Sequence, residues 1–483
     1  MDEHSPDYSR KWYVMAAVGM GIFLSTVDGS IVNIALPTLV NTFERDLAIV
    51  QWVVLAYMLT VSVLLLGVGR AADMIGKKPL YTAGFIIFTI GSVLCGLSPT
   101  IFFLIGFRVI QAIGAALIMA LGMAIVTESF PSTERGKALG IIGGVVSIGI
   151  VVGPTLGGLI TDILSWHWIF FVNLPVGVIG TVMVLRFVPN VKPPGGQRFD
   201  YWGAVTLFIS IFALLLGFTL GQQNGFTDRF PLLLFALWAL FLILFVLIER
   251  RAEQPMIDLA VFKDDQFSVG LVTGFITFIA IAGTVLLMPF YLQNVLGYST
   301  REVGLLMAVV PVVLGIAAPL SGSLSDRFGT RPITVIGLLV LLVGYYSLST
   351  LKTDTPTIGF LLRFLPIGIG MGIFQSPNNS AIMGSASRSR LGIVSGMLAI
   401  TRSLGQTTGV ALLVALWTSR VFARTGSKLS TGATGATPAD QVAGLHDTFV
   451  FITIVIGLAL ALSAWALFQQ RWKTGRDIEA QLP

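Results

Sequence analysis

Long apolar runs, each of roughly 18 or more residues, recur from one end of the chain to the other and limit its fold more than any other feature. A helix of that length crosses the hydrocarbon core of a bilayer. Charged residues make up 11% of the 483 residues, against about 25% in soluble domains. We therefore expect an all-α polytopic membrane protein. The fourteen predicted spans begin near Trp12, Gln51, Pro79, Ile101, Gly136, Trp168, Asp200, Phe230, Gln266, Glu302, Pro332, Thr357, Leu391 and Asp447.

The basic residues in the connections indicate the orientation of the chain. An even number of spans puts both termini on one side, and most Lys and Arg residues of the connections fall on that side. Because basic loops stay in the cytoplasm, we expect both termini there, with the protein in the inner or plasma membrane. The net charge of +6 is explained by these loops, so nucleic acid is not an expected partner.

Parts of the sequence repeat. GRAADMIGKKP (69–79) returns as GSLSDRFGTRP (322–332), 253 residues later. Arg108 returns as Arg363 at an offset of 255 residues, and Gly149 and Gly153 return as Gly405 and Gly409 at an offset of 256 residues. This indicates two six-helix halves in parallel order, as in transporters that bind substrate between repeats near the midplane. We predict a bundle over 1–190, a linker with two extra spans over 191–263, and a second bundle with a cytoplasmic tail over 264–483.

The first repeated segment predicts a cytoplasmic gate loop in each half. Its glycines permit a tight turn, and its aspartate can accept hydrogen bonds, meet the positive end of a helix dipole or pair with a base. A plain topology anchor is the alternative, but the repetition favours a latch that forms and breaks as the halves move. The residues assigned to these loops are Gly69, Asp73, Gly76, Lys77, Lys78, Asp326, Gly329 and Arg331.

The fifth span carries GIVVGPTLGG (149–158), a pattern of glycines four residues apart. Gly149, Gly153 and Gly157 share one face and let another helix approach closely, and Gly158 follows them. Pro154 removes a backbone hydrogen bond and can bend the helix. A smooth, bent face suits a gate between the halves, while pure helix packing is the alternative.

Asp28 is a carboxylate in the middle of the first apolar run. A charge at the centre of a membrane helix costs roughly 2.5–3.5 kcal/mol on insertion scales, so such residues usually have a partner and a function. By residue count Asp28 and Arg108 lie about 12 Å and about 10 Å below the outer ends of their helices. We expect them to pair, either as a switch that opens when Asp28 is protonated or as a static salt bridge.

The combination of motifs resembles the major facilitator superfamily. G-x3-D-x2-G-K-K is similar to its loop signature, and G-x3-G-P-x2-G-G to its antiporter signature. VDGSIVNIALP, QWVVLAYMLT and WHWIFFVNLPVG resemble the first, second and sixth helices of its fourteen-helix drug/proton antiporters. One departure is Gly29-Ser30, where that branch often has a residue followed by threonine; a hydroxyl is retained.

The resemblance implies a major facilitator fold and a proton-coupled exporter of amphipathic or lipophilic drugs that acts by alternating access. It links Asp28 and Arg108 to proton coupling, and it favours a structural role for Arg402. We expect a monomer in membrane lipid, with an accessory envelope protein as an optional partner. The residues that we assign to a candidate substrate cavity are Tyr57, Arg363, Gln375, Asn378 and Arg402.

Other functions stay open. The chain could export one native metabolite, such as a lipid or siderophore, or act as a membrane sensor or enzyme; the antiporter signature argues against import. The sequence has no P-loop and no metal-ligand spacing, and its three histidines lie near ends or loops, so we expect no enzyme activity, cofactor or metal. The polar loop 419–446 is either a partner site or a plain connector.

Overall fold

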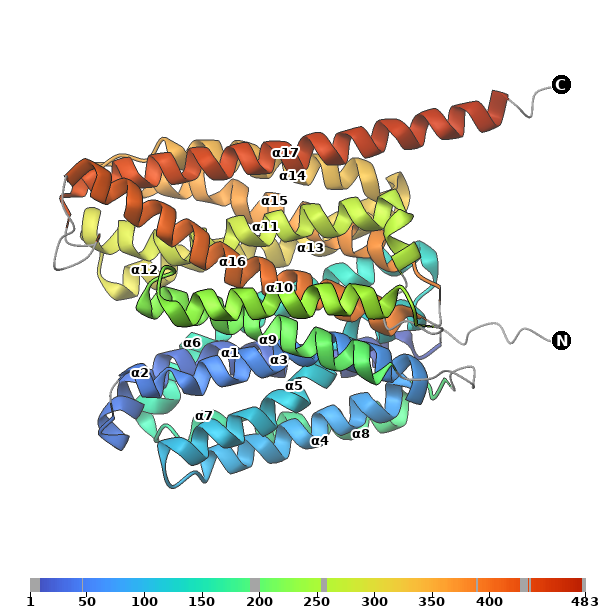
Figure 1. Cartoon of the computed structure of the whole chain (residues 1–483), viewed down its shortest axis with the longest axis horizontal. Coiled ribbons are helices and arrows are strands. Elements are labelled where there is room, and N and C mark those ends of the chain that lie inside the picture. The colour runs from blue at the N-terminus through green and yellow to red at the C-terminus, as the bar shows by residue number, and fades with distance from the viewer. Residues whose placement is uncertain are drawn as a thin grey trace. The chain divides into compact units, whose positions relative to one another are not determined.

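A computed structural model describes residues 9–45, 47–191, 200–252, 259–387, 390–425, 433 and 436–479 (Figure 1). Within these residues all regular structure is helical, and fourteen helices are long and apolar enough to cross a membrane. All fourteen predicted spans are present, and all but the last begin within four residues of the predicted start.

The helices of the first part of the chain are α1 (Lys11–Phe43), α2 (Leu47–Val50), α3 (Trp52–Ile75), α4 (Lys77–Gly96), α5 (Ile101–Ser129), η1 (Ser132–Glu134), α6 (Arg135–Ile163), α7 (Trp168–Phe171), α8 (Asn173–Phe187), α9 (Tyr201–Asn224) and α10 (Arg229–Glu249). Those of the second part are η2 (Leu259–Lys263), α11 (Asp265–Phe290), η3 (Tyr291–Val295), α12 (Thr300–Met307), α13 (Val309–Phe328), α14 (Thr330–Ser349), α15 (Thr357–Gly384), α16 (Leu391–Thr425) and α17 (Pro438–Glu479).

Contacts divide the chain into two compact units. The first unit is Met1–Leu259 with Ala386–Ile400, and the second unit is Ala260–Ser385 with Thr401–Pro483. The first turns of α16 therefore belong to the first unit and the rest of that helix belongs to the second.

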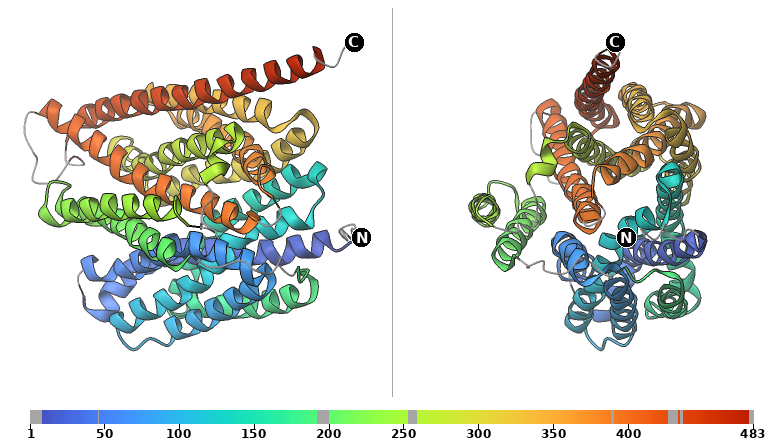
Figure 2. Two further views of the ribbon diagram at one scale, coloured as in Figure 1. Left: turned by 45° about the vertical axis from the view of Figure 1, so that its right-hand side comes forward. Right: turned by 90° about the vertical axis from the view of Figure 1, so that its right-hand side faces the viewer.

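In the first unit, α1 packs against α5, α6 and α8, and α4 packs against α5 and α8. Helix α3 contacts both α5 and α9, and α10 packs on α9; this last pair is the green one in Figure 2. The two extra helices of the predicted linker therefore join the first unit through α3.

The second unit repeats this packing. Helix α11 contacts α15 and α17, α14 contacts the same two helices, and α13 contacts α15. These pairs correspond to α1 with α5 and α8, α4 with α5 and α8, and α3 with α5. Gly405 and Gly409 of α16 lie against α11, as Gly149 and Gly153 of α6 lie against α1. The sequence repeat thus corresponds to a repeat in helix packing.

The repeated loops have similar turns. Gly76 between α3 and α4 has φ 110°, and Gly329 between α13 and α14 has φ 87°, values that favour glycine. In each loop, the basic residue two positions after the glycine donates to a backbone carbonyl. The acceptor lies on α8 in the first unit and on α17 in the second. Lys78 Nζ is 2.7 Å from Leu185 O, and the Arg331 guanidinium donates to Ala466 O.

The prediction of a long connector over 419–446 was wrong. Helix α16 continues to Thr425 and the next helix already begins at Pro438. The reason is tertiary packing, because Val421 is fully buried and a Cβ at Gly444 would lie 2.7 Å from its side chain. Most of the segment between the two helices, where a partner site was considered, lies outside the described residues.

Candidate functional site

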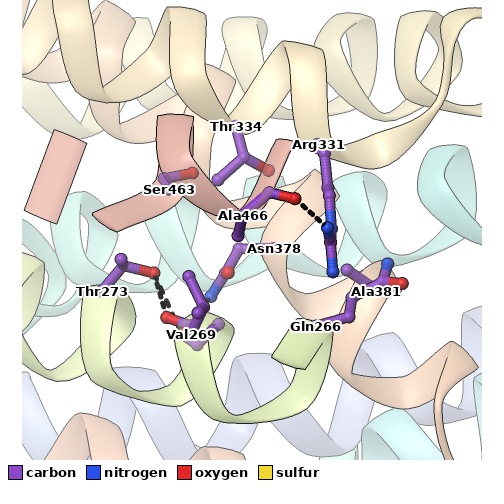
Figure 3. Close-up of a pocket in the computed structure, with 10 residues that line it drawn as sticks. Gln266, Val269, Thr273, Arg331, Thr334, Asn378, Ala381, Ser463 and Ala466 are labelled. Carbon is purple, nitrogen blue, oxygen red and sulfur yellow. Dashed lines mark hydrogen bonds between the residues drawn. The ribbon is translucent and has the colours of Figure 1, made fainter. Parts of the chain in front are cut away.

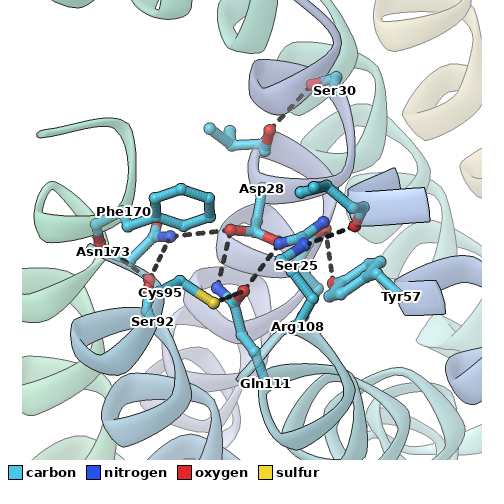
Figure 4. Close-up of polar contacts among 12 residues, drawn as sticks. Ser25, Asp28, Ser30, Tyr57, Ser92, Cys95, Arg108, Gln111, Phe170 and Asn173 are labelled. Carbon is cyan, nitrogen blue, oxygen red and sulfur yellow. Dashed lines mark hydrogen bonds and ion pairs between the residues drawn. The ribbon is translucent and has the colours of Figure 1, made fainter. Parts of the chain in front are cut away.

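Asp28 and Arg108 form an ion pair inside the first unit. Both side chains are completely buried, and Asp28 Oδ2 lies 2.6 Å from Arg108 Nη1 (Figure 4). Asp28 is on α1 and Arg108 on α5, so the structure brings together the two residues whose depths predicted a pair. Complete burial of both charges means that each depends on the other for compensation.

Two amide side chains complete the environment of the carboxylate. Gln111 Nε2 donates to Asp28 Oδ1 at 2.8 Å, and Asn173 Nδ2 donates to the same oxygen at 3.0 Å. The carboxylate therefore accepts three hydrogen bonds, counting that of Arg108, from α5 and α8. Both oxygens of this buried carboxylate thus have donors.

Arg108 is held on several sides. Its Nε donates to Val53 O of α3 at 3.0 Å, and its Nη1 also donates to Gln111 Oε1 at 2.7 Å. The guanidinium carbon lies 4.1 Å from the centre of the Tyr57 ring, a cation–π distance. The Arg108 Nη2 atom is buried and has no hydrogen-bond partner among the described residues. Arg108 thus keeps several contacts that do not involve Asp28.

A second layer of contacts supports the amides. Asn173 Nδ2 also lies 3.0 Å from Ser92 Oγ, and Ser92 Oγ donates to Phe170 O at 2.8 Å. The Cys95 thiol is 3.6 Å from Gln111 Oε1. The sequence interpretation missed Gln111, Asn173 and Ser92 as members of this site. The available signal was Gln111, an amide three residues after Arg108 in an otherwise apolar span, and therefore on the same helix face.

The glycine face of α6 packs against the part of α1 that carries Asp28. A Cβ at Gly149 would lie 2.9 Å from Thr26 Cβ, one at Gly153 would lie 1.9 Å from Ser30 Oγ, and one at Gly157 would lie 2.9 Å from Ile31 O. Gly158, by contrast, has no atom within 4 Å of an added Cβ. The predicted close helix approach is present at all three glycines for which it was predicted. The side chain of Pro154 is outside the described residues.

Asp73 caps the first turn of α16 within the first unit. Its two carboxylate oxygens each accept a backbone N–H at 2.9 Å, from Gly392 and Ile393. Gly69 allows this approach, because an added Cβ would lie 2.5 Å from Gly392 O. Lys77 Nζ is 3.4 Å from Asp73. All three roles considered for this aspartate are present: it accepts hydrogen bonds, it lies at the positive end of a helix dipole and it pairs with a basic group.

We expect Asp73→Asn to lower the free energy of unfolding by about 1–3 kcal/mol, because the amide removes the charge and one of two charge-assisted acceptors from a buried helix terminus. Thermal unfolding of the purified protein, followed by intrinsic fluorescence, measures this. The matched control is Glu128→Gln, which removes only the other partner of Lys77, at 2.8 Å. Equal stability of the two variants would contradict the capping role.

The residues assigned to a substrate cavity are dispersed. Tyr57 lies in the first unit, where its ring covers Arg108, and it is 4% exposed. Arg363 lies near the start of α15, where it donates to Gly359 O and to Thr350 Oγ1. Asn378 is fifteen residues further along the same helix, or about 22 Å. Gln375 and Arg402 are both half-buried.

Asn378 lines a small cavity in the second unit (Figure 3). The cavity volume is about 20 Å³, room for about one water molecule and far below the size of a drug site. Asn378 Nδ2 donates to Gly270 O at 3.0 Å and Arg331 closes one side by its bond to Ala466. The lining consists of Gln266, Val269, Gly270, Thr273, Arg331, Thr334, Asn378, Ala381, Ser463 and Ala466.

Comparisons with known proteins agree with this architecture. The human organic anion transporter MFSD10 (TETRAN) superposes with a TM-score of 0.68 at 15% identity, covering 95% of this chain and 100% of that one. The riboflavin transporter RibZ of Clostridioides difficile is 38% identical over 83% of this chain and 87% of its own length. The multidrug transporter protein MdtP of Bacillus subtilis is 31% identical over 91% of this chain and 82% of its own.

A family model described as Major Facilitator Superfamily matches residues 18–410, which is most of the chain. This match agrees with the all-helical fold, the fourteen candidate spans and the repeated packing. The family consists of transporters rather than enzymes. The chain therefore belongs to the Major Facilitator Superfamily, as a multi-pass membrane transporter related to fourteen-span multidrug resistance proteins.

Proposed function

We propose that the protein is a proton-coupled antiporter that exports amphipathic or lipophilic drugs from the cytoplasm or the inner leaflet by alternating access. The observation that carries the proposal is Asp28, a completely buried carboxylate in a spanning helix with Arg108, Gln111 and Asn173 as its donors. An ionisable residue inside the membrane is expensive and usually belongs to an ion pathway.

Proton binding at Asp28 would change the packing of three helices. The carboxylate joins α1 to α5 through Arg108 and to α8 through Asn173, so loss of its charge weakens both connections. Arg108 would then rest on Val53 O and the Tyr57 ring, which it already contacts. A static salt bridge would have the same contacts but would not respond to a proton gradient.

The glycine face of α6 supports a coupling between this site and helix movement. Thr26 and Ser30, which Gly149 and Gly153 approach, flank Asp28 on α1. A shift of α1 that accompanies protonation would therefore be felt directly by α6. In this scheme the loops around Asp73 and Asp326 act as gates on the cytoplasmic side, both termini lie in the cytoplasm, and the protein works as a monomer in the inner or plasma membrane.

A second candidate is transport of one native metabolite. The relative that is 38% identical is named a riboflavin transporter, which favours a planar, polar heterocycle as the cargo. The multidrug names of other relatives at 31% and 33% identity support the drug proposal. Both candidates use the same fold and differ only in substrate.

Transport in proteoliposomes distinguishes the candidates. An imposed pH gradient should drive uptake of ethidium, rhodamine 123 or norfloxacin, and a proton ionophore should abolish it. Uptake that survives the ionophore would contradict proton coupling. Exchange of labelled riboflavin, with no movement of any of the three drugs, would replace the drug proposal by the metabolite proposal.

Asn173→Ala should lower the rate of gradient-driven uptake, because the buried carboxylate of Asp28 loses one of its three donors and its connection to α8; a hydrogen bond to a charged group is worth about 1.5–3 kcal/mol. Initial uptake rates in proteoliposomes measure the effect. Thr89→Ala is the control, because among the described residues the Thr89 hydroxyl bonds only Phe85 O of its own helix. An unchanged rate would remove Asn173 from the proton site.

A further inference from the structure

Helix α16 carries a polar stretch, TRSLGQTT (401–408), inside a candidate span. Its mean hydropathy of 1.2 is the lowest of the fourteen candidate spans, whose values reach 3.0. The stretch includes one charged side chain, Arg402, in the part of the helix that belongs to the second unit. The crossing of the membrane alone does not explain why this segment is polar.

Arg402 lies deep in the span. It is eleven residues after Leu391, or about 16 Å along the helix, close to the middle of a hydrocarbon core about 30 Å thick. Gln406 is four residues further and shares its helix face. Arg402 is half-buried and Gln406 is exposed. A charge and an amide facing lipid at that depth would be costly, so we expect a polar environment at this face.

The guanidinium of Arg402 has no hydrogen bond or ion pair with any residue that the structure describes. Arg108 and Arg363, the two arginines aligned by the repeat, each have acceptors, respectively Asp28 with Val53 O and Gly359 O with Thr350. A guanidinium offers five N–H donors and cannot be deprotonated in proteins. Within the described part of the chain, its donors are therefore left for water or for a ligand.

No acidic residue of the described spans is free to attract a cation at this depth. Asp28 is completely buried under three donors. The acidic residues in the described spans of the second unit lie toward the helix ends. The uncompensated charge at mid-depth in the second unit is therefore positive.

We propose that Arg402 is the anchor for an anionic group of the substrate, such as a carboxylate, phosphonate or sulfonate on an amphipathic body, with Gln406 beside it as an amide partner. This rests on the proposed export of amphipathic compounds and narrows it to anionic or zwitterionic ones. Planar, forked recognition by arginine suits such groups better than it suits a lipophilic cation.

Two dyes test the assignment, because rhodamine 123 is the methyl ester of rhodamine 110 and differs from it only in lacking the free carboxylate. Binding to the purified full-length protein in detergent is followed by fluorescence polarisation. We expect rhodamine 110 to bind about tenfold more tightly than its ester to the wild type. Arg402→Gln should lose about tenfold affinity for rhodamine 110 and less than about twofold for the ester, and Arg402→Lys should keep part of the preference.

The matched control is Arg424→Gln, which removes an arginine of the same helix that is already paired with Asp447 at 3.1 Å and should leave the preference unchanged. Equal binding of the two dyes to the wild type, no binding of either, or an equal loss of both in Arg402→Gln would overturn the assignment. The measurement needs no pH gradient, so a failure of proton coupling and a failure of anion recognition give separate results.

Discussion

Replacing Asp28 by Asn should abolish uptake driven by a pH gradient while dye binding changes by less than about threefold. Asparagine has nearly the same shape and keeps an oxygen that can accept from Arg108. Asn173 can rotate its amide to meet the new NH₂ group, whereas Gln111 Nε2 loses its acceptor. The variant therefore resembles the protonated protein but can neither take up nor release a proton. Proteoliposome uptake and detergent binding, measured on one preparation, check both parts.

Asp200→Asn is the control for the loss of a negative charge. Asp200 caps α9 by accepting from Gly203 N, and asparagine caps helices equally well, so this variant should transport normally. If the gradient still drives uptake in Asp28→Asn, the contact with Arg108 is a structural strut and the proton enters elsewhere. If binding is lost together with uptake, Asp28 is needed for substrate binding or for folding rather than for proton transfer.

Gly153→Val should abolish transport and lower the free energy of unfolding, whereas Gly158→Val should do neither. At position 153 the added Cβ would lie 1.9 Å from Ser30 Oγ and 3.2 Å from Val27 O, so α6 must move away from α1; overpacking of this kind costs about 1–3 kcal/mol. At position 158 the added Cβ meets no atom within 4 Å. Uptake assays and thermal unfolding of both variants test the contrast.

A double substitution shows whether the contact itself is responsible. Gly153→Ala should be impaired, and Ser30→Ala should restore part of its activity, because it removes the oxygen that the new methyl group meets; Ser30 Cβ would still be 3.0 Å away. The two changes must therefore be non-additive. Additive effects would contradict this explanation, and so would a Gly158→Val variant that is equally impaired. In either case the motif would exclude side chains for a reason other than the close approach to α1.

The spans and the ion pair were predictable because the local sequence is enough to identify both. Each span is long and apolar, and residue counts along helices of known rise give the depths of Asp28 and Arg108. The amides were not predictable in the same way. An asparagine or glutamine in a span can equally serve its own backbone or a neighbouring helix, and only the fold shows that Asn173 of α8 reaches Asp28 of α1.

The helix ends near the outer connector were mispredicted for a related reason. SRVFART and the residues after Pro438 look like loop sequence because they are polar and poor in long apolar runs. Val421 makes them helical by packing against Gly444, a contact between residues 23 positions apart that no local pattern reveals. The roles of the loop glycines were accessible to sequence, since a positive φ at Gly76 and Gly329 follows from the tight turn itself.

Helix α10 has the highest mean hydropathy of the candidate spans, 3.0, and the lowest share of buried residues in its apolar segment, 11%. Its apolar side chains therefore meet lipid tails more than neighbouring helices, and lipid does not select for shape. A library of random substitutions along α10 should tolerate any exchange among Leu, Ile, Phe and Val and reject charges, whereas the same library in α5, which is 72% buried, should distinguish among those four residues. Among homologues, the residues of α10 should therefore change rapidly, while the helix stays composed of apolar residues.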